Sequence, residues 1–438
     1  MLRRAIGASA IGNATEWYDY GVYGYLAITI GKAFFPGDVQ ATTLASLGLF
    51  AAGFLIRPFG GIILGPIGDR IGRQKVLAFT ILVMSGCTFL IGVLPTYQQI
   101  GIAAPALLLL LRLIQGFSTG GEYGGAATFM AEYAPDKRRG FLGSFLEFGT
   151  LWGYIVGALV TLLFSTVLPD SSWGWRIPFL LGLPLGLVGL YLRSRLEDTP
   201  VFQELEQQGA KEKDTKSQVK EILGHWRPML ILGGLVIMLN LTDYTLLTYM
   251  PTYLQGPLKL TETAALLLTI GMYAVMLLVI NSFGKLSDRV GRKPLWYASS
   301  IGFIVLAFPA FLLINRSWGT AIIGLVVLGV LLVLQLSTIS ATFPALFPTQ
   351  VRYAGFAITY NIFTSAFGGT APAVNDAVIK ATGFNLWPAV YMMIGSAIGL
   401  VAVFFMPETA GASLRGTEQP DVEKQQAVSP GGPEPATS

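Results

Sequence analysis

Two carboxylic acids stand inside an apolar stretch near the start of the chain. Glu16 and Asp19 lie near the middle of a run from about residue 5 to 30, and about 20 helical residues span a bilayer. Because a charge at that depth costs at least about 2.5 kcal/mol, an acid there is by default a candidate functional residue. Residues three or four apart share a helix face, so Tyr20 and Tyr23 continue the face of the acids. Such a face can hold a cation; alternatively, the acids bind structural partners on a neighbouring helix.

Other charged residues lie within later apolar stretches. Arg57 stands roughly midway along the second stretch. It either binds a substrate carboxylate through two nitrogens or forms a structural bridge to one of the intramembrane acids. Arg112 stands in the outer part of the fourth stretch, and Glu122 lies ten residues deeper, about 15 Å along a helix. Glu122 and Tyr123 follow two glycines, an irregular point that can open a cavity. Asp243 lies in the seventh stretch, just outside the midplane.

Several aromatic residues share the depth of these acids. Quaternary ammonium ligands favour aromatic faces, at about 0.5–2 kcal/mol each, whereas most tyrosines of a membrane protein are packing residues or interfacial anchors. We take Tyr20, Tyr23 and Tyr244 as exceptions because of their depth. The predicted substrate- and proton-binding residues are Glu16, Asp19, Tyr20, Tyr23, Arg57, Arg112, Glu122, Tyr123, Asn240, Asp243 and Tyr244.

Composition restricts the class of protein. The chain is 53% hydrophobic and 12% charged, about half the charge of a soluble protein, which predicts a polytopic membrane protein. Its only cysteine, Cys87, lies in an apolar stretch and its only histidine, His225, in a hydrophilic loop. We therefore expect no metal or other cofactor and no histidine as the intramembrane proton carrier. The apolar stretches carry no catalytic cluster, so we do not expect an enzyme. The absence of a GxxxxGK[ST] pattern excludes ATP as the direct driver.

Twelve apolar stretches can be distinguished, six on each side of a long polar gap. They predict an all-α membrane protein with an N-terminal six-helix bundle (1–194), a cytoplasmic linker (195–227), a C-terminal six-helix bundle (228–407) and a disordered cytoplasmic tail (408–438). With both termini inside, the cytoplasmic segments hold 22 of the 29 lysines and arginines and the outer segments five. This positive-inside asymmetry predicts a multi-pass cell-membrane protein with both termini cytoplasmic.

The two halves repeat one another. The string GPIGDRIGR at residues 65–73 matches GKLSDRVGR at 284–292, and PDKRR at 135–139 echoes PTQVR at 348–352. Repeats in register imply two pseudo-symmetric bundles with a site between them. The acid–base pairs of the two matching strings at residues 65–73 and 284–292 can lock the bundles together at the inner face. The alternative is that these strings form solvated loops that determine the membrane topology. The predicted cytoplasmic gate consists of Asp69, Arg70, Arg73, Asp288, Arg289 and Arg292.

These motifs resemble those of the major facilitator superfamily over about residues 5–407. The repeated G-x-x-x-D-R-x-G-R loop and R-x-x-Q-G at residues 112–116 carry the resemblance. The strings GNATEWYDY, IRPFGG, LRLIQGFSTGGE and WGWRIPF are similar to its metabolite:proton symporter branch. Within that branch, NLTDYTLLTYMPTYL (240–254) and FPTQVRYAGFAITYNI (347–362) resemble the proline/glycine betaine:proton symporters. The resemblance implies that Arg112 competes with the proton for a carboxylate; the alternative is a static ion pair between spans one and four.

The resemblance implies secondary active transport: proton-coupled symport of a small zwitterion of the proline/glycine betaine type, by alternating access. The excess of intramembrane acids and aromatic residues also favours a zwitterion. A dicarboxylate would need two or more cations, and only Arg57 and Arg112 are candidates. The alternative is proton symport of a dicarboxylate or other organic acid, of the 2-oxoglutarate, citrate or shikimate type. Expected partners are the substrate, protons and the lipid bilayer, with no nucleic acid, and the monomer is expected to function.

Because no histidine lies in the membrane, a carboxylate has to carry the coupling proton. Unperturbed carboxyl groups titrate near pH 4, and burial shifts their pKa by up to about 3–5 units towards neutrality. Glu16, Asp19 and Glu122 are the candidates in the N-terminal bundle, and Asp243 is the next one.

The orientation can be tested with single cysteines at Lys380 and Ser217 in a chain that lacks Cys87. An impermeant thiol reagent should label position 380 from outside and position 217 only from the cytoplasmic side. The reverse pattern would contradict the predicted topology.

Overall fold

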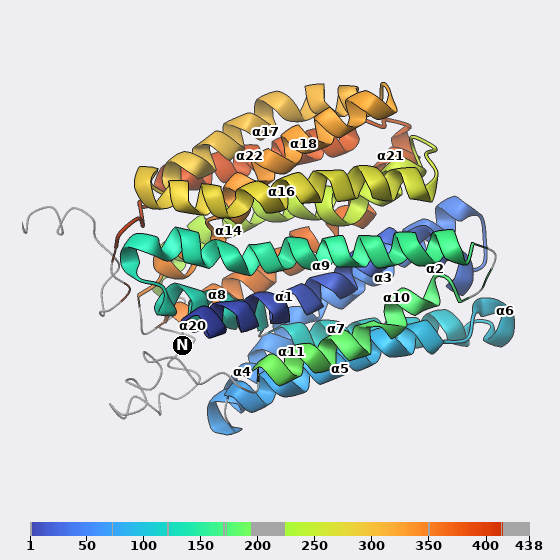
Figure 1. The fold of residues 1–438 in the computed structure, drawn as a ribbon, viewed down its shortest axis with the longest axis horizontal. Coiled ribbons are helices and arrows are strands. Elements are labelled where there is room, and N and C mark those ends of the chain that lie inside the picture. The colour runs from blue at the N-terminus through green and yellow to red at the C-terminus, as the bar shows by residue number, and fades with distance from the viewer. Residues whose placement is uncertain are drawn as a thin grey trace, which may run out of the picture.

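The computed structural model describes residues 2–71, 73–120, 122–169, 171, 173–193, 224–348, 351–412 and 414, and all of its regular elements are helical. Within these ranges successive elements join into twelve rods, six before residue 194 and six after residue 223 (Figure 1). Eight helices of the described part are long and apolar enough to cross a membrane, and Ala78–Val93 and Arg176–Tyr191 are shorter apolar helices. The predicted all-α fold of twelve transmembrane helices is confirmed.

The six rods of the first half consist of α1 (Leu2–Tyr25) with α2 (Ala27–Phe34), α3 (Val39–Leu55) with α4 (Arg57–Ile71), α5 (Arg73–Val93) followed by α6 (Tyr97–Ile100), α7 (Ala103–Thr119) with α8 (Glu122–Tyr133), η1 (Asp136–Arg138) with α9 (Arg139–Val167), and α10 (Arg176–Leu180) with α11 (Gly182–Arg193).

The second half consists of α14 (Trp226–Asp243) with η2 (Tyr244–Tyr249) and α15 (Met250–Gln255), α16 (Glu262–Val290), α17 (Lys293–Ile314), α18 (Trp318–Leu336) with α19 (Ile339–Thr342) and η3 (Pro344–Leu346), α20 (Arg352–Phe363) with η4 (Thr364–Gly368) and α21 (Ala371–Thr382), and α22 (Trp387–Phe405). The two halves meet mainly where α9 runs beside α16 (Figure 1).

Glycines let spans cross at backbone contact. A Cβ atom on Gly116 of α7 would lie 1.6 Å from the carbonyl oxygen of Gly53 on α3. On α9, a Cβ atom on Gly153 would lie 2.3 Å from the carbonyl oxygen of Ala14 on α1. Small residues allow this close approach within a membrane. The crossings lie close to Arg57 and Arg112 on these neighbouring spans. Their guanidinium groups face the Tyr20 and Tyr23 rings of α1, the helix that carries the acids.

Two prolines interrupt spans next to the interface between the halves. Proline has no N–H, so the carbonyl four residues earlier loses its helical donor. The carbonyl of Phe54, four residues before Pro58, accepts a hydrogen bond from Ser365 Oγ (2.6 Å), a residue of the other half. The carbonyl of Leu247, four residues before Pro251, accepts one from Tyr273 Oη (2.6 Å). The second break coincides with the π-helical segment η2, and such segments are frequent at functional sites.

Candidate functional site

A buried ion pair joins the first and fourth spans. Asp19 Oδ2 lies 3.5 Å from Arg112 Nη1, and both side chains are about 2–3% exposed. Asp19 also accepts hydrogen bonds from Thr88 Oγ1 (2.7 Å) and Gln115 Nε2 (3.3 Å). The Arg112 guanidinium lies 4.0 Å from the ring centre of Tyr23. A proton on Asp19 would therefore compete directly with the arginine, as the resemblance implies, and the same pair also holds spans one and four together.

Arg57 is a buried cation of a different kind. Its guanidinium carbon lies 3.7 Å from the ring centre of Phe54 and 4.9 Å from that of Tyr20. Its Nε and Nη2 atoms are buried without a hydrogen-bond partner. None of the described acids forms an ion pair with it, although Glu16 is near enough to act on it electrostatically. A structural bridge from Arg57 to Asp19 or Glu16 is therefore not observed, and two donors remain for an anionic group.

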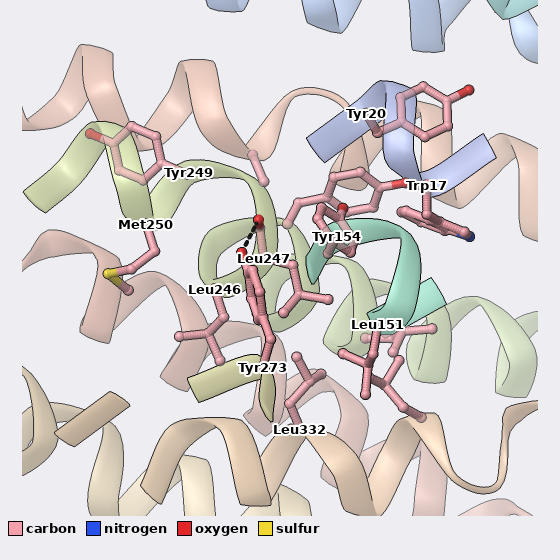
Figure 2. Packing of buried hydrophobic residues seen from close by; sticks show 14 of the residues in the cluster. Trp17, Tyr20, Leu151, Tyr154, Leu246, Leu247, Tyr249, Met250, Tyr273 and Leu332 are labelled. Atoms are coloured by element: carbon pink, nitrogen blue, oxygen red, sulfur yellow. Dashed lines mark hydrogen bonds between the residues drawn. The ribbon is translucent and has the colours of Figure 1, made fainter. Parts of the chain in front are cut away.

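Aromatic rings surround this part of the interface. The Trp17 ring lies 5.6 Å from the rings of Tyr20 and Tyr154 and 6.0 Å from that of Tyr244. The Phe54 ring lies 5.3 Å from that of Tyr244. We call these five residues the aromatic cluster; all are at most 5% exposed. Figure 2 shows Trp17 beside Tyr154, on α1 and α9. The cluster draws on spans one, two, five and seven, so it joins both halves of the chain.

Two acids lie on the side of the cluster that Tyr154 and Tyr244 occupy. Asp243 precedes Tyr244, is 4% exposed, and has a buried Oδ1 atom without a hydrogen-bond partner. Glu147 of α9 accepts a hydrogen bond from Thr150 Oγ1 (2.9 Å) and acts electrostatically on Asp243 from the other half. The Tyr244 hydroxyl is buried and also lacks a partner. The site thus combines a buried cation, aromatic rings and acids that come from both halves of the chain.

The remaining predicted residues fall into three groups. Tyr20 and Tyr23 donate within the first half, to Thr119 Oγ1 (3.3 Å) and the Ser46 carbonyl (3.0 Å). Asn240 donates to Thr364 Oγ1 (3.1 Å) and so ties α14 to η4. The side chains of the other two predicted residues, Glu122 and Tyr123, lie outside the described residues.

Sequence reasoning did not include Trp17, Phe54, Thr88, Gln115, Glu147 and Tyr154 among the site residues. Gln115 had a signal, because it stands in R-x-x-Q-G, and Glu147 had another, as an acid in an apolar span. The three aromatic residues and the threonine had no such signal. Their place in the site depends on contacts between spans.

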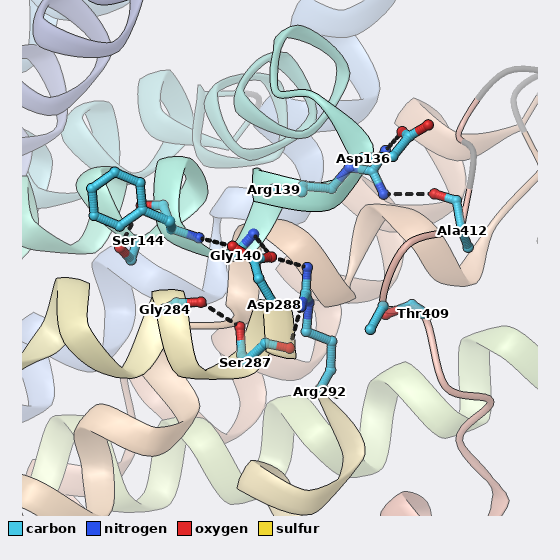
Figure 3. A network of polar contacts seen from close by, with 12 residues as sticks. Asp136, Arg139, Gly140, Ser144, Gly284, Ser287, Asp288, Arg292, Thr409 and Ala412 are labelled. Carbon is cyan, nitrogen blue, oxygen red and sulfur yellow. Dashed lines mark hydrogen bonds and ion pairs between the residues drawn. The ribbon is translucent and has the colours of Figure 1, made fainter. Parts of the chain in front are cut away.

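One acid of the predicted gate links the two halves in an unexpected way. Asp288 pairs with Arg292 (2.8 Å) and accepts hydrogen bonds from the backbone N–H groups of Gly140 and Phe141, both 2.8 Å (Figure 3). These groups are at the N-terminus of α9, where the helix dipole favours a carboxylate. Asp288 of the second half is therefore bound to backbone N–H groups of the first half. Arg289 is exposed and outside this network.

The first copy of the gate motif gives no such detail. The side chains of Asp69, Arg70 and Arg73 lie outside the described residues, so their gate role stays a prediction.

Comparison with known proteins identifies the family. The sugar (and other) transporter family model matches residues 5–419. The chain belongs to this family of the major facilitator superfamily. It is 46% identical over 427 residues to the glycine betaine/proline/ectoine/pipecolic acid transporter OusA of Dickeya dadantii, covering 95% of this chain and 85% of the relative. It is 46% identical over 439 residues to the proline/betaine transporter of Salmonella typhimurium, covering 97% and 87%.

A solved structure shows the same fold at low sequence identity. The proton:xylose symporter XylE, bound to 6-bromo-6-deoxy-D-glucose, aligns with a TM-score of 0.75 at 18% identity, covering 94% of this chain and 97% of that one. The family model and the relatives at 46% identity show that the chain is a membrane transporter and not an enzyme, as the sequence predicted.

The gate can be tested at Asp288. Asp288→Asn should lower the initial rate of substrate uptake about tenfold, because a charge-assisted hydrogen bond contributes about 1.5–3 kcal/mol. The matched control is Lys285→Gln, which removes a charge at an exposed position of the same helix and should transport normally. Equal rates in the two variants, at equal protein in the membrane, would show that the Asp288 contacts do not govern the cycle.

Proposed function

We propose that this transporter carries a small zwitterionic solute of the proline/betaine type into the cell, driven by protons through alternating access. The observation that carries the proposal is Arg57, a buried cation with two unpartnered donors beside the aromatic cluster. The names of the relatives at 46% identity support the substrate class. We further propose that the monomer is functional, that the halves divide at residues 195–227, and that both termini are cytoplasmic.

The geometry suggests how a zwitterion would bind. Its carboxylate would take the free Nε and Nη2 donors of Arg57, a planar pair suited to two parallel hydrogen bonds. Its ammonium group would lie against the rings of Trp17, Tyr154 and Tyr244, which attract cations through their faces. Asp243, next to Tyr244, places a carboxyl group close enough to act electrostatically on Tyr154 and Tyr244. One carboxylate and one ammonium group thus match one cation and one acidic, aromatic surface.

This arrangement favours a zwitterion over the alternative, a dicarboxylate. A dicarboxylate would need two cations, and of the two predicted ones Arg112 already pairs with Asp19 and Gln115. Of these two cations only Arg57 has two unpartnered donors, and the one described acid that acts on it electrostatically is Glu16.

For the proton we propose Asp19, with Asp243 as the second candidate. Protonation of Asp19 would neutralise the group that holds Arg112, and the arginine could then turn to another acceptor. The pair lies within one half of the chain, so the proton would act by releasing Arg112 and its neighbours on spans three and four. Asp243 differs from Asp19 because Glu147, the acid that acts on it electrostatically, belongs to the opposite half.

Uptake of labelled proline, glycine betaine and 2-oxoglutarate into proteoliposomes tests the substrate class. With an imposed pH gradient, we expect accumulation of the two zwitterions and none of 2-oxoglutarate. Accumulation of 2-oxoglutarate alone would contradict the proposal and support the dicarboxylate alternative.

Arg57→Lys tests the carboxylate contact. Lysine keeps the charge but loses the planar pair of donors, so the KM for glycine betaine should rise about tenfold or more, equivalent to about 1.4 kcal/mol. The control is Arg316→Lys at an exposed position outside the predicted site and gate. An unchanged KM in Arg57→Lys would show that the substrate carboxylate binds elsewhere.

A further inference from the structure

The residues that follow the last span remain in contact with the rest of the protein. Glu408 follows α22, and its carboxylate accepts hydrogen bonds from the backbone N–H groups of Arg292 (2.8 Å) and Lys293 (3.0 Å) at the start of α17. It also accepts from the N–H groups of Thr409 and Ala410, both 2.9 Å. The carboxylate thus fixes the first residues beyond the membrane to the second half of the transporter. We call residues 408–412 together with Leu414 the C-terminal strap.

The strap then contacts both halves through two buried arginines. Arg139 Nη1 donates to the Ala412 carbonyl (2.8 Å), and Arg352 Nη2 donates to the Leu414 carbonyl (2.9 Å). Each arginine is 1% exposed. Arg139 begins α9 of the first half and Arg352 begins α20 of the second half. They are the last residues of the repeated strings PDKRR and PTQVR, so equivalent positions of the two halves bind one segment.

An apolar contact accompanies these hydrogen bonds. Leu414 is 5% exposed and packs in a small buried cluster with Ala131 and Ala345. Ala131 belongs to α8 in the first half, and Ala345 to η3 in the second half. The leucine side chain therefore lies between the cytoplasmic ends of the two halves and touches both.

The strap adjoins the gate already described. Arg139 immediately precedes Gly140, whose N–H binds Asp288, while its side chain reaches Asp136 and the carbonyl of Ala412 (Figure 3). One residue thus borders the Asp288 network on one side and the strap on the other.

We infer that the C-terminal strap is a latch that holds the cytoplasmic ends of the two halves together. Opening towards the cytoplasm separates Ala131 and Arg139 from Ala345 and Arg352. The strap cannot keep contacts with both halves once they part. Because Glu408 anchors it to α17, the contacts with Arg139 and Ala131 are the ones that break. The strap therefore stabilises the closed cytoplasmic face, and losing it shifts the transporter towards the state open to the cytoplasm.

Thiol accessibility in the purified full-length transporter tests this inference. The background carries Cys87→Ser, which removes the only cysteine, and the reporter is Ser340→Cys. Ser340 is 1% exposed, and its Cβ would lie 3.2 Å from a Cβ atom on Gly143 of the opposite half. Truncation after Gly411 removes Ala412 and Leu414, whereas the matched control ends after Gly416 and keeps both. The shorter chain should label about tenfold faster with an impermeant maleimide, as expected if the closed state loses about 1.4 kcal/mol.

A point variant covers the case in which truncation prevents folding. Leu414→Asp places a charge between two alanines and should raise the labelling rate in the same way, whereas Leu414→Met keeps an apolar contact and should not. Equal labelling rates within both pairs, in proteins that elute as single species, would overturn the inference. The measurement uses no substrate, so its outcome is independent of the proposed substrate and proton coupling.

Discussion

The ion pair between Asp19 and Arg112 is the interaction on which the first half of this transporter depends. Neither charge is tolerable alone in a medium of low dielectric constant, and removing one partner of a buried pair costs about 3–5 kcal/mol. Thr88, Gln115 and the Tyr23 ring complete the surroundings of the pair. Spans one, three and four are therefore held together at one point. Adding a proton to Asp19 would change the charge of that point.

Arg57 differs from Arg112 because it forms no ion pair with any of the described acids. It lies against Phe54 and Tyr20 and keeps two donors without a partner. The proline two residues into α4 makes this possible, because it breaks the span beside Arg57 and frees the Phe54 carbonyl for Ser365 of the other half. The same break thus places a cation at the interface and fastens the interface next to it.

Much of the architecture could be predicted from local pattern. The twelve apolar stretches and the all-α fold follow from hydropathy alone, and the structure confirms them. The repeat of PDKRR and PTQVR marked two arginines that prove to be equivalent, buried and bound to one segment. The acid Asp288 was identified as a gate residue, but its partners in the other half are backbone N–H groups, which no charge pattern reveals. The positions of Trp17, Phe54 and Glu147 could not be predicted because they depend on contacts between distant spans. The domain boundaries, the orientation and the gate role of Asp69, Arg70, Arg73, Asp288, Arg289 and Arg292 stay predictions.

The most direct measurement of the central claim compares accumulation with exchange in Asp19→Asn. One proton moving down 100 mV supplies about 2.3 kcal/mol, enough for roughly fifty-fold accumulation of a neutral zwitterion at 1.4 kcal/mol per tenfold. Asparagine keeps the size of the side chain and an acceptor for Thr88 Oγ1 but cannot titrate, so it imitates the protonated acid. Because the loss of the charge also lowers stability, the rates are compared at equal amounts of folded protein. We expect proteoliposomes with Asp19→Asn to exchange labelled glycine betaine at a rate close to that of the unaltered protein, and to show no accumulation when the proton gradient is the only driving force. Undiminished accumulation in this variant would show that the coupling proton is carried elsewhere and would contradict the account.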